Sequence, residues 1–106
     1  MKTGVVIYSN DPETVWNAYR FGNVARAMGD EVRVFLIGKG VKHESLDTNT
    51  FKVSEQLKQF LDSGGKVFIC GTCLKIHRLQ APKIFSVATL TDLYNIVGES
   101  DRIITF

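Results

Sequence analysis

Cys70 and Cys73 carry the most reactive side chains of this 106-residue chain, and only Gly71 and Thr72 separate them. A disulfide between them would close a loop too short to stabilise a fold by much. In a reducing compartment, such a pair is more typical of catalysis or metal binding than of a structural crosslink. The two cysteines therefore direct the search for function to thiol chemistry.

The position of Cys70 favours a reactive thiol. Cys70 ends the apolar run KVFIC at residues 66–70, and Gly71 allows the backbone to turn sharply behind it. In open parallel sheets, binding and chemistry gather beyond the carboxyl ends of the strands. The amides of the following turn, the positive end of a helix starting near Thr72, and Lys75 would favour thiolate over thiol. Because a thiolate attacks other sulfur atoms, this position suits sulfur chemistry.

Three chemistries and one structural role compete for these cysteines. A dithiol redox pair, as in thioredoxin-like proteins, has this spacing. The aromatic residue that flanks such a pair is absent, however, and the strand with a cis-proline is not evident, since Pro82 is the only later proline. Structural zinc needs four ligands, and with His77 the two cysteines supply three, so His43 or a second chain would have to contribute. The third possibility is a cysteine that holds a persulfide and passes it on. Structurally, Cys70 can also be a small buried hydrophobe that ends a strand.

Two other segments follow predicted strands, and neither indicates a phosphate site. Residues 9–11 (Ser-Asn-Asp) are better suited to capping a helix than to binding phosphate. Residues 38–40 (Gly-Lys-Gly) are too short for a phosphate-binding loop and lack its Lys-Ser/Thr ending. Several basic residues near the cysteines in sequence form either a mildly basic rim or an ordinary solvated surface: Lys39, Lys42, Lys75, Arg78 and Lys83.

The hydrophobic pattern predicts alternating strands and helices around these segments. We expect strands over residues 3–9, 32–37, 66–70, 84–87 and 102–106, and helices over 12–28, 51–61, 71–78 and 89–97, with 38–50 as a loop. Asp11 and Pro12 fit a helix start, and Gly29, Gly64 and Gly98 fit helix ends. Strands that are apolar on both sides favour a mainly parallel sheet of about five strands with helices on both faces. Periodicity does not give the strand order.

Composition limits the class of protein. The chain has the size of one domain, with 44% hydrophobic and 23% charged residues and a net charge of +2. That balance predicts no direct nucleic-acid binding. The apolar runs are far shorter than a membrane-spanning helix needs, and the N-terminal sequence lacks a secretory pattern. We therefore expect a cytoplasmic protein with no membrane partner.

The chain resembles the DsrE/DsrF-like family of sulfur-relay proteins along nearly its whole length. The segment VVIYSNDPETVWNAYRFGNVARAMGDEVRVFLIGKGV has the family's strand, helix, strand and Gly-Val loop in order. The central KVFICGTCLK has the cysteine at the end of its strand, and IFSVATLTDLYNIVGESDRIITF resembles the closing helix and the Asp-Arg-apolar final strand. Each motif is degenerate, but together and in order they are fairly specific.

The resemblance implies one domain over residues 1–106, a three-layer α/β sandwich that oligomerises, and a persulfide on the cysteine that corresponds to Cys70. Cys73 is a departure from the best-understood relay subunits, and it could resolve a persulfide into a disulfide. We therefore expect a sulfur carrier, or sulfurtransferase-like protein, that acts through Cys70 and Cys73 with Gly71, Thr72 and Lys75 in support. It needs no cofactor or metal. The alternatives are a dithiol redox protein and a non-catalytic binding or assembly module.

Assembly is a further expectation, with sulfur-donor and sulfur-acceptor proteins as possible partners. A domain of this size leaves about a third of its unfolded surface exposed, so some aromatic rings should stay outside the core and mark contacts with other copies. The rings considered are Trp16, Tyr19, Phe21, Phe35, Phe51, Phe60, Phe68, Phe85, Tyr94 and Phe106. The sequence thus predicts a homo-oligomer between a dimer and a hexamer.

Overall fold

Strands and helices alternate along the whole chain in a computed structural model that describes residues 1–106. The strands are β1 (Lys2–Ile7), β2 (Glu31–Leu36), β3 (Lys66–Cys70), β4 (Ser86–Ala88) and β5 (Arg102–Thr105). The helices are α1 (Pro12–Ala27), α2 (Val53–Asp62), α3 (Gly71–Ile76) and α4 (Leu90–Glu99), with a 3-10 helix, η1, at Gly38–Val41.

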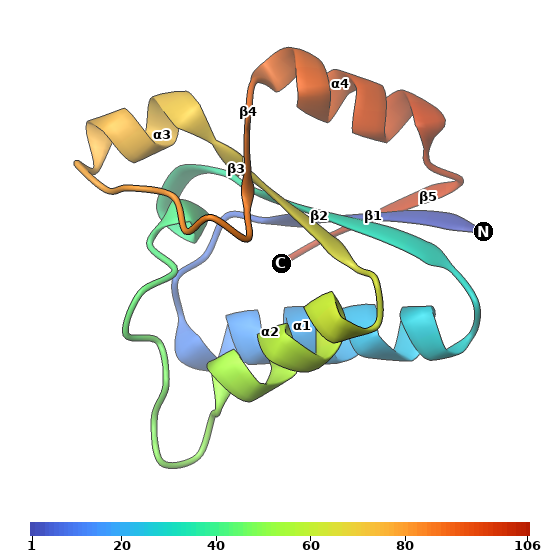
Figure 1. Cartoon of the computed structure of the whole chain (residues 1–106), viewed down its shortest axis with the longest axis horizontal. Helices are drawn as coiled ribbons and strands as arrows, with labels where there is room; N and C mark the ends of the chain where they lie inside the picture. The colour runs from blue at the N-terminus through green and yellow to red at the C-terminus, as the bar shows by residue number, and fades with distance from the viewer.

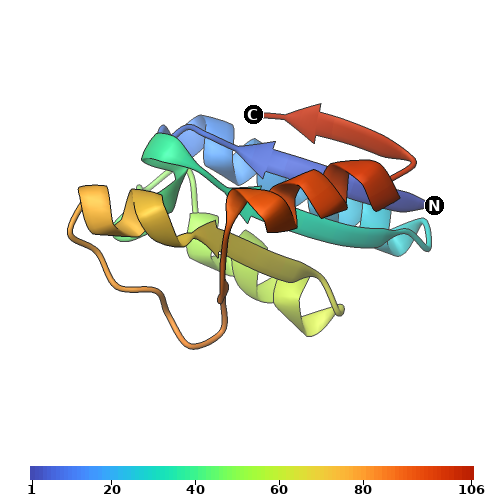
Figure 2. The same ribbon diagram turned by 90° about the horizontal axis from the view of Figure 1, so that it is seen from above.

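The five strands form one parallel sheet in the order β4-β3-β2-β1-β5. Helices α1 and α2 cover one face, while α3 and α4 lie on the other (Figure 1). Seen from above, β5 lies beside β1 at one edge of the sheet (Figure 2). The predicted three-layer α/β sandwich with a mainly parallel sheet is confirmed.

The sheet register brings the carboxyl ends of three strands level with one another. Ile7 of β1 pairs with Leu36 of β2, which in turn pairs with Ile69 of β3. The segments that follow these three residues therefore emerge at the same end of the sheet. They include η1 and the two cysteines.

The layer of α1 and α2 forms because each helix has one apolar side. Asp11 caps α1 by accepting the backbone N–H of Thr14 at 3.0 Å, and Pro12 occupies the first turn, where no donor is needed. Phe60 of α2 is fully buried, and its ring lies 6.0 Å from that of Tyr19 on α1. This packing covers the sheet face opposite α4.

Most boundaries differ from the sequence-based expectation by one or two residues, and three differences change an element or a predicted helix end. The loop after β2 contains η1. The fourth strand is displaced to Ser86–Ala88, because Cys70 of β3 pairs with Ala88. The prediction that Gly98 ends a helix is wrong: its φ is not positive, α4 continues to Glu99, and the N–H of the capping residue Ser100 donates to the Ile96 carbonyl at 3.0 Å.

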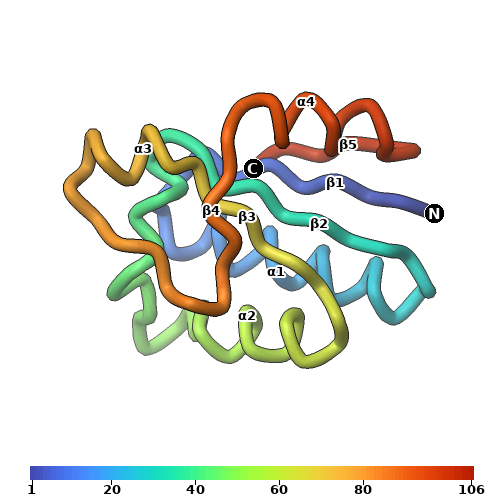
Figure 3. Tube along the Cα trace, turned by 45° about the horizontal axis from the view of Figure 1, so that its top comes forward, coloured from blue at the N-terminus to red at the C-terminus, as the bar shows by residue number.

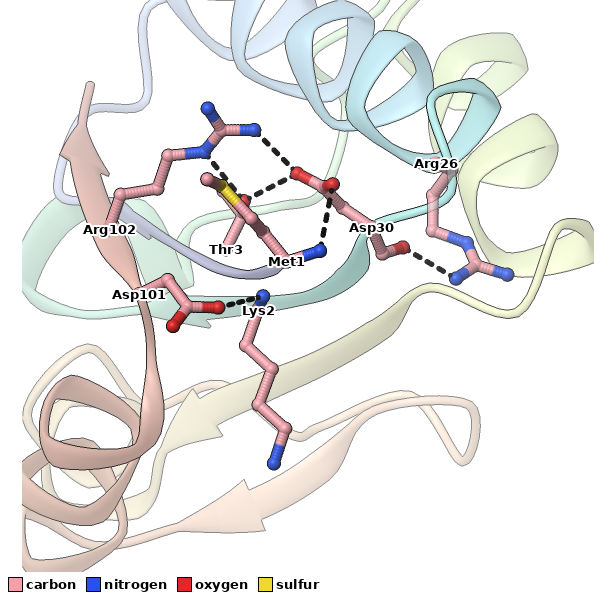
Figure 4. A network of polar contacts seen from close by, with 7 residues as sticks. All are labelled: Met1, Lys2, Thr3, Arg26, Asp30, Asp101 and Arg102. Atoms are coloured by element: carbon pink, nitrogen blue, oxygen red, sulfur yellow. Dashed lines mark hydrogen bonds and ion pairs between the residues drawn. The ribbon is translucent and has the colours of Figure 1, made fainter.

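At the end of the sheet opposite the cysteines, where the parallel strands begin, Asp30 connects three elements (Figure 4). Its carboxylate accepts hydrogen bonds from Thr3 Oγ1 at 2.8 Å and Arg102 Nη2 at 2.6 Å, and it lies 3.3 Å from the Met1 amine. The hydrogen bond from Thr3, followed by that from Arg102, lowers the pKa of Asp30 from 3.8 to about 2. The network connects β1, β2 and β5 although their residues are far apart in sequence.

We expect acid to weaken this network, because a lowered carboxyl pKa stabilises the fold only while the group is ionised. The contribution is complete above the unfolded pKa and is lost as pH falls from about 4 to about 2. Urea unfolding should therefore show the stability difference between wild type and Asp30→Asn narrowing over that pH range. A difference that stays constant from about pH 5 to about pH 2 would contradict the assignment.

No helix of the structure is both long enough and apolar enough to cross a bilayer.

Candidate functional site

Strand β3 places Cys70 at the sheet edge predicted from the sequence. Its last two residues, Ile69 and Cys70, are both buried, and the Cys70 side chain is only 4% exposed. Cys70 has an extended backbone and serves as the N-cap of α3. The thiol thus lies where the strand ends and helical amides begin.

The Cys-Gly-Thr-Cys spacing brings the second cysteine against the first. The backbone N–H of Cys73 donates to Cys70 Sγ at 3.4 Å, the bond expected of an N-cap and the third helical residue. The Cys70 thiol also contributes to raising the pKa of Cys73, so the two side chains are close enough to interact. Both cysteines are free in the structure. They are therefore positioned for exchange between the two sulfur atoms.

The environment of Cys73 favours the neutral thiol. Burial, followed by the hydrogen bond with the Cys70 thiol, raises the pKa of Cys73 above its ordinary value. The backbone N–H of Gly38 acts in the opposite direction by donating to Cys73 Sγ at 3.3 Å. Cys73 is thus protonated at neutral pH, with one amide already directed at its sulfur.

Helix η1 supplies that amide, a contact that was not predicted from the sequence. Gly38 has φ of +58°, a backbone conformation that side chains disfavour. A Cβ on Gly40 would lie 2.1 Å from the Ile7 carbonyl oxygen. The Gly-Lys-Gly segment therefore holds η1 close to β1 and beside α3, as Figure 2 also shows. The sequence feature that could have predicted this contact is the pair of glycines, Gly38 and Gly40, just after a strand.

The three supporting residues differ in their contacts. Gly71 lies under β4, and a Cβ there would come within 3.1 Å of Val87 Cγ1, so the turn behind Cys70 favours glycine. The side chains of Thr72 and Lys75 are exposed and make no hydrogen bond, to a sulfur atom or to any other group. Stabilisation of a thiolate in this structure therefore comes from backbone amides.

The histidines lie apart from the thiols. His77 caps the C-terminus of α3 through its backbone. The His43 ring meets Phe85 edge-on at 5.4 Å, and its Nε2 atom is buried without a hydrogen-bond partner. No three His, Cys, Asp or Glu side chains gather closely enough to hold a metal ion. The residues considered for zinc thus do not form a common ligand set.

Comparison with known proteins identifies the family. The sequence model of the DsrE/DsrF-like family matches residues 1–106. This chain belongs to the DsrE/DsrF-like family. The DsrE/DsrF-like protein is also 34% identical to an uncharacterized protein of Methanocaldococcus jannaschii, over 89% of this chain and 88% of that one. An uncharacterized protein of Methanopyrus kandleri is 36% identical over 95% of this chain and 91% of its own length.

Solved structures share the fold of this DsrE/DsrF-like protein. The ychN protein from Escherichia coli superimposes with a TM-score of 0.84 at 20% identity, with both chains fully covered. A conserved protein of unknown function from Bacteroides thetaiotaomicron gives a TM-score of 0.76 at 18% identity, over 99% of this chain and 94% of that one. At these identities, the similarity establishes the fold.

Proposed function

We propose that this DsrE/DsrF-like protein is a cytoplasmic sulfur carrier that holds sulfane sulfur as a persulfide on Cys70. Membership of the family suggests a role related to sulfur relay. The observation that carries the proposal is the position of Cys70 Sγ, which ends β3 and accepts the Cys73 amide at 3.4 Å. An amide directed at sulfur stabilises the thiolate and equally the anionic form of a persulfide.

The loading step is an exchange between sulfur atoms. The Cys70 thiolate attacks the outer sulfur of a donor persulfide and forms a new S–S bond. The S–S bond of the donor breaks, and the donor leaves as a thiolate that takes up the proton of the former persulfide. No net oxidation occurs, so the step needs neither a cofactor nor a metal. Delivery to an acceptor thiolate is the same reaction in reverse.

Mass spectrometry after exposure to a low-molecular-weight persulfide tests this function. We expect an increase of about 32 Da, one sulfur atom, localised to Cys70 in the wild type and in Cys73→Ser, and absent from Cys70→Ser. The two serine variants control for each other, because each retains one thiol in the same turn. An adduct on Cys73 alone, or one that persists in Cys70→Ser, would contradict the assignment.

The position of both cysteines in one turn, with the Cys73 amide on Cys70 Sγ, gives a dithiol redox protein some support as a second candidate. In that case the persulfide donor should yield a Cys70–Cys73 disulfide and no adduct. Thiols that stay unmodified throughout would instead indicate a binding or assembly module whose cysteines are incidental. Early time points distinguish the three functions, because a carrier shows the adduct on Cys70 before any disulfide, a redox protein shows the disulfide without a preceding adduct, and a module shows neither.

We also propose that the protein forms homo-oligomers through the face that contains α4. Of the ten aromatic rings considered in the sequence, only Tyr94 is exposed, at 78%. Only this ring therefore supports the prediction that exposed aromatic residues mark contacts between copies. Leu90 and Val97 are also exposed on α4, and their spacing of four and three residues from Tyr94 places all three on one side of the helix. An exposed apolar helix face of this kind is typical of contacts between proteins.

Light scattering after size exclusion tests this assembly. We expect a mass at least twice the 11.9 kDa of one chain for the wild type, and a shift toward one chain for Tyr94→Glu. A charged residue would have to lose its hydration at the interface, which is costly. Tyr8→Glu is the control, because Tyr8 is also exposed but lies at the end of β1, away from α4. A wild-type mass near 11.9 kDa at micromolar concentration would reject the oligomer.

A further inference from the structure

The segments on either side of the cysteines carry an excess of positive charge. Residues 38–46 and 71–88 contain five basic side chains and one acidic side chain, Glu44, which gives +4. Because the whole chain carries +2, the remainder carries −2. We define these five cations as the basic rim: Lys39, Lys42, Lys75, Arg78 and Lys83.

The basic rim is not neutralised within the chain. All five side chains are exposed, and none takes part in an ion pair or a side-chain hydrogen bond. Elsewhere, Arg33, Lys58 and Arg102 are each paired with a carboxylate, and Arg26 donates to backbone carbonyls. Five of the eight lysines and arginines without an ion pair or a side-chain hydrogen bond therefore belong to the basic rim, and the other three are Lys2, Lys52 and Lys66.

Tertiary contacts join the two basic segments at the cysteine edge. The Gly38 amide donates to Cys73 Sγ, so η1 and α3 lie side by side. The His43 ring contacts Phe85, which brings the chain after η1 against the chain before β4. Figure 3 shows the α3–β4 connection beginning at the same end of the sheet as η1. The two segments that carry the basic rim thus lie together at the end of the sheet where Cys70 ends β3.

No cavity adjoins the thiols. The structure has three cavities, of about 590, 150 and 400 Å³, and neither Cys70 nor Cys73 lines any of them. A small molecule would find no enclosing pocket at the sulfur atoms, whereas a macromolecule can contact an open charged surface. The exchanging thiol is therefore better supplied by another protein.

We propose that the basic rim docks an acidic protein segment that carries the thiol with which Cys70 exchanges sulfur. This inference rests on the proposed carrier function and names the partner class for the same site. An acidic segment of the partner complements the charge of +4 on the basic segments of this chain. Electrostatic attraction steers the partner toward the basic rim, over a distance that shortens as the salt concentration increases. RNA would also be attracted to the cations, but it offers no thiol for exchange.

Peptide probes test the docking without a persulfide. Two peptides of about ten residues, one rich in glutamate and one in lysine, each carry a single cysteine activated as its thionitrobenzoate disulfide. The Cys70 thiolate attacks the peptide sulfur, the activated S–S bond breaks, and coloured thionitrobenzoate leaves. Each rate is divided by the rate of the same protein variant with uncharged dipyridyl disulfide, which corrects for differences in intrinsic thiol reactivity.

The expected result is a charge preference that salt removes. At low salt the acidic peptide should react about tenfold faster than the basic one, and the ratio should approach one at about 1 M salt, where the screening length is about 3 Å. The variant Lys42→Glu/Arg78→Glu/Lys83→Glu should reverse the preference. The control Lys2→Glu/Lys66→Glu makes a similar change at exposed, unpaired lysines at the other end of the sheet, and it should keep the preference.

Three results would overturn the proposal. The first is equal normalised rates for the two peptides at low salt. The second is the same loss of preference in the control variant. The third is stronger inhibition by a short single-stranded RNA than by a cysteine-free acidic peptide of equal charge, which would identify a nucleic-acid surface. Failure of the carrier function appears separately, as the absence of a persulfide on Cys70 in proteins that still show the charge preference.

Discussion

Replacing Cys73 with serine is expected to lengthen the lifetime of a persulfide on Cys70 by about tenfold or more. In the wild type, the Cys73 thiolate can attack the inner sulfur of the persulfide. The Cys70–Cys73 disulfide then forms, and hydrosulfide leaves with the outer sulfur. The Cys73 amide donates to Cys70 Sγ at 3.4 Å, so Cys73 lies in the same turn as the sulfur that it would attack, and serine cannot perform this attack.

The pH dependence of that decay follows from the raised pKa of Cys73. Below its pKa, the thiolate fraction of Cys73 increases about tenfold for each unit of pH, and the wild-type decay rate should increase in parallel. Mass spectrometry of the loaded protein over time gives the rate, and released sulfide gives an independent measure. Cys73→Ser should show a slower decay without this slope.

A matched control is available within the same turn. Thr72 is exposed and makes no side-chain hydrogen bond, so Thr72→Ser should decay at the wild-type rate. Equal lifetimes in the wild type and Cys73→Ser would eliminate Cys73 as a resolving thiol. That result would leave the carrier role of Cys70 intact.

Replacing Gly40 with alanine is expected to destabilise the fold by about 3 kcal/mol. The new Cβ would lie 2.1 Å from the Ile7 carbonyl oxygen and 2.8 Å from its carbon, both backbone atoms of a central strand. That same oxygen accepts the N–H of Ile37 at 3.0 Å, so β1 cannot move without loss of this bond. Helix η1 has to move instead, and the Gly38 amide moves with it away from Cys73.

Gly98→Ala is the control for this substitution. A Cβ on Gly98 meets nothing within 4 Å, and the residue lies inside α4, so alanine should raise the free energy of unfolding by up to about 1 kcal/mol. Urea unfolding of both variants measures the contrast. If Gly40→Ala were as stable as Gly98→Ala, the close approach of η1 to β1 would be wrong.

The sequence by itself determined the local elements whose signals are contiguous along the chain. Asp11 and Pro12 begin α1 as predicted, since capping and proline geometry depend only on neighbouring residues. The run KVFIC forms β3 with the predicted bounds, because an apolar stretch before a glycine needs no distant partner to be recognised. For the same reason, the residues around Cys70 are sufficient to place its thiol at the end of a strand.

Tertiary structure alone decided the contacts between residues far apart in sequence. The strand order, the Gly38–Cys73 contact across 35 residues and the Asp30–Arg102 contact across 72 depend on how the elements pack. Periodicity describes which face of an element is apolar and contains no information about which strand becomes its neighbour. The raised pKa of Cys73 belongs to the same class, because burial and the approach of η1 exist only in the folded chain.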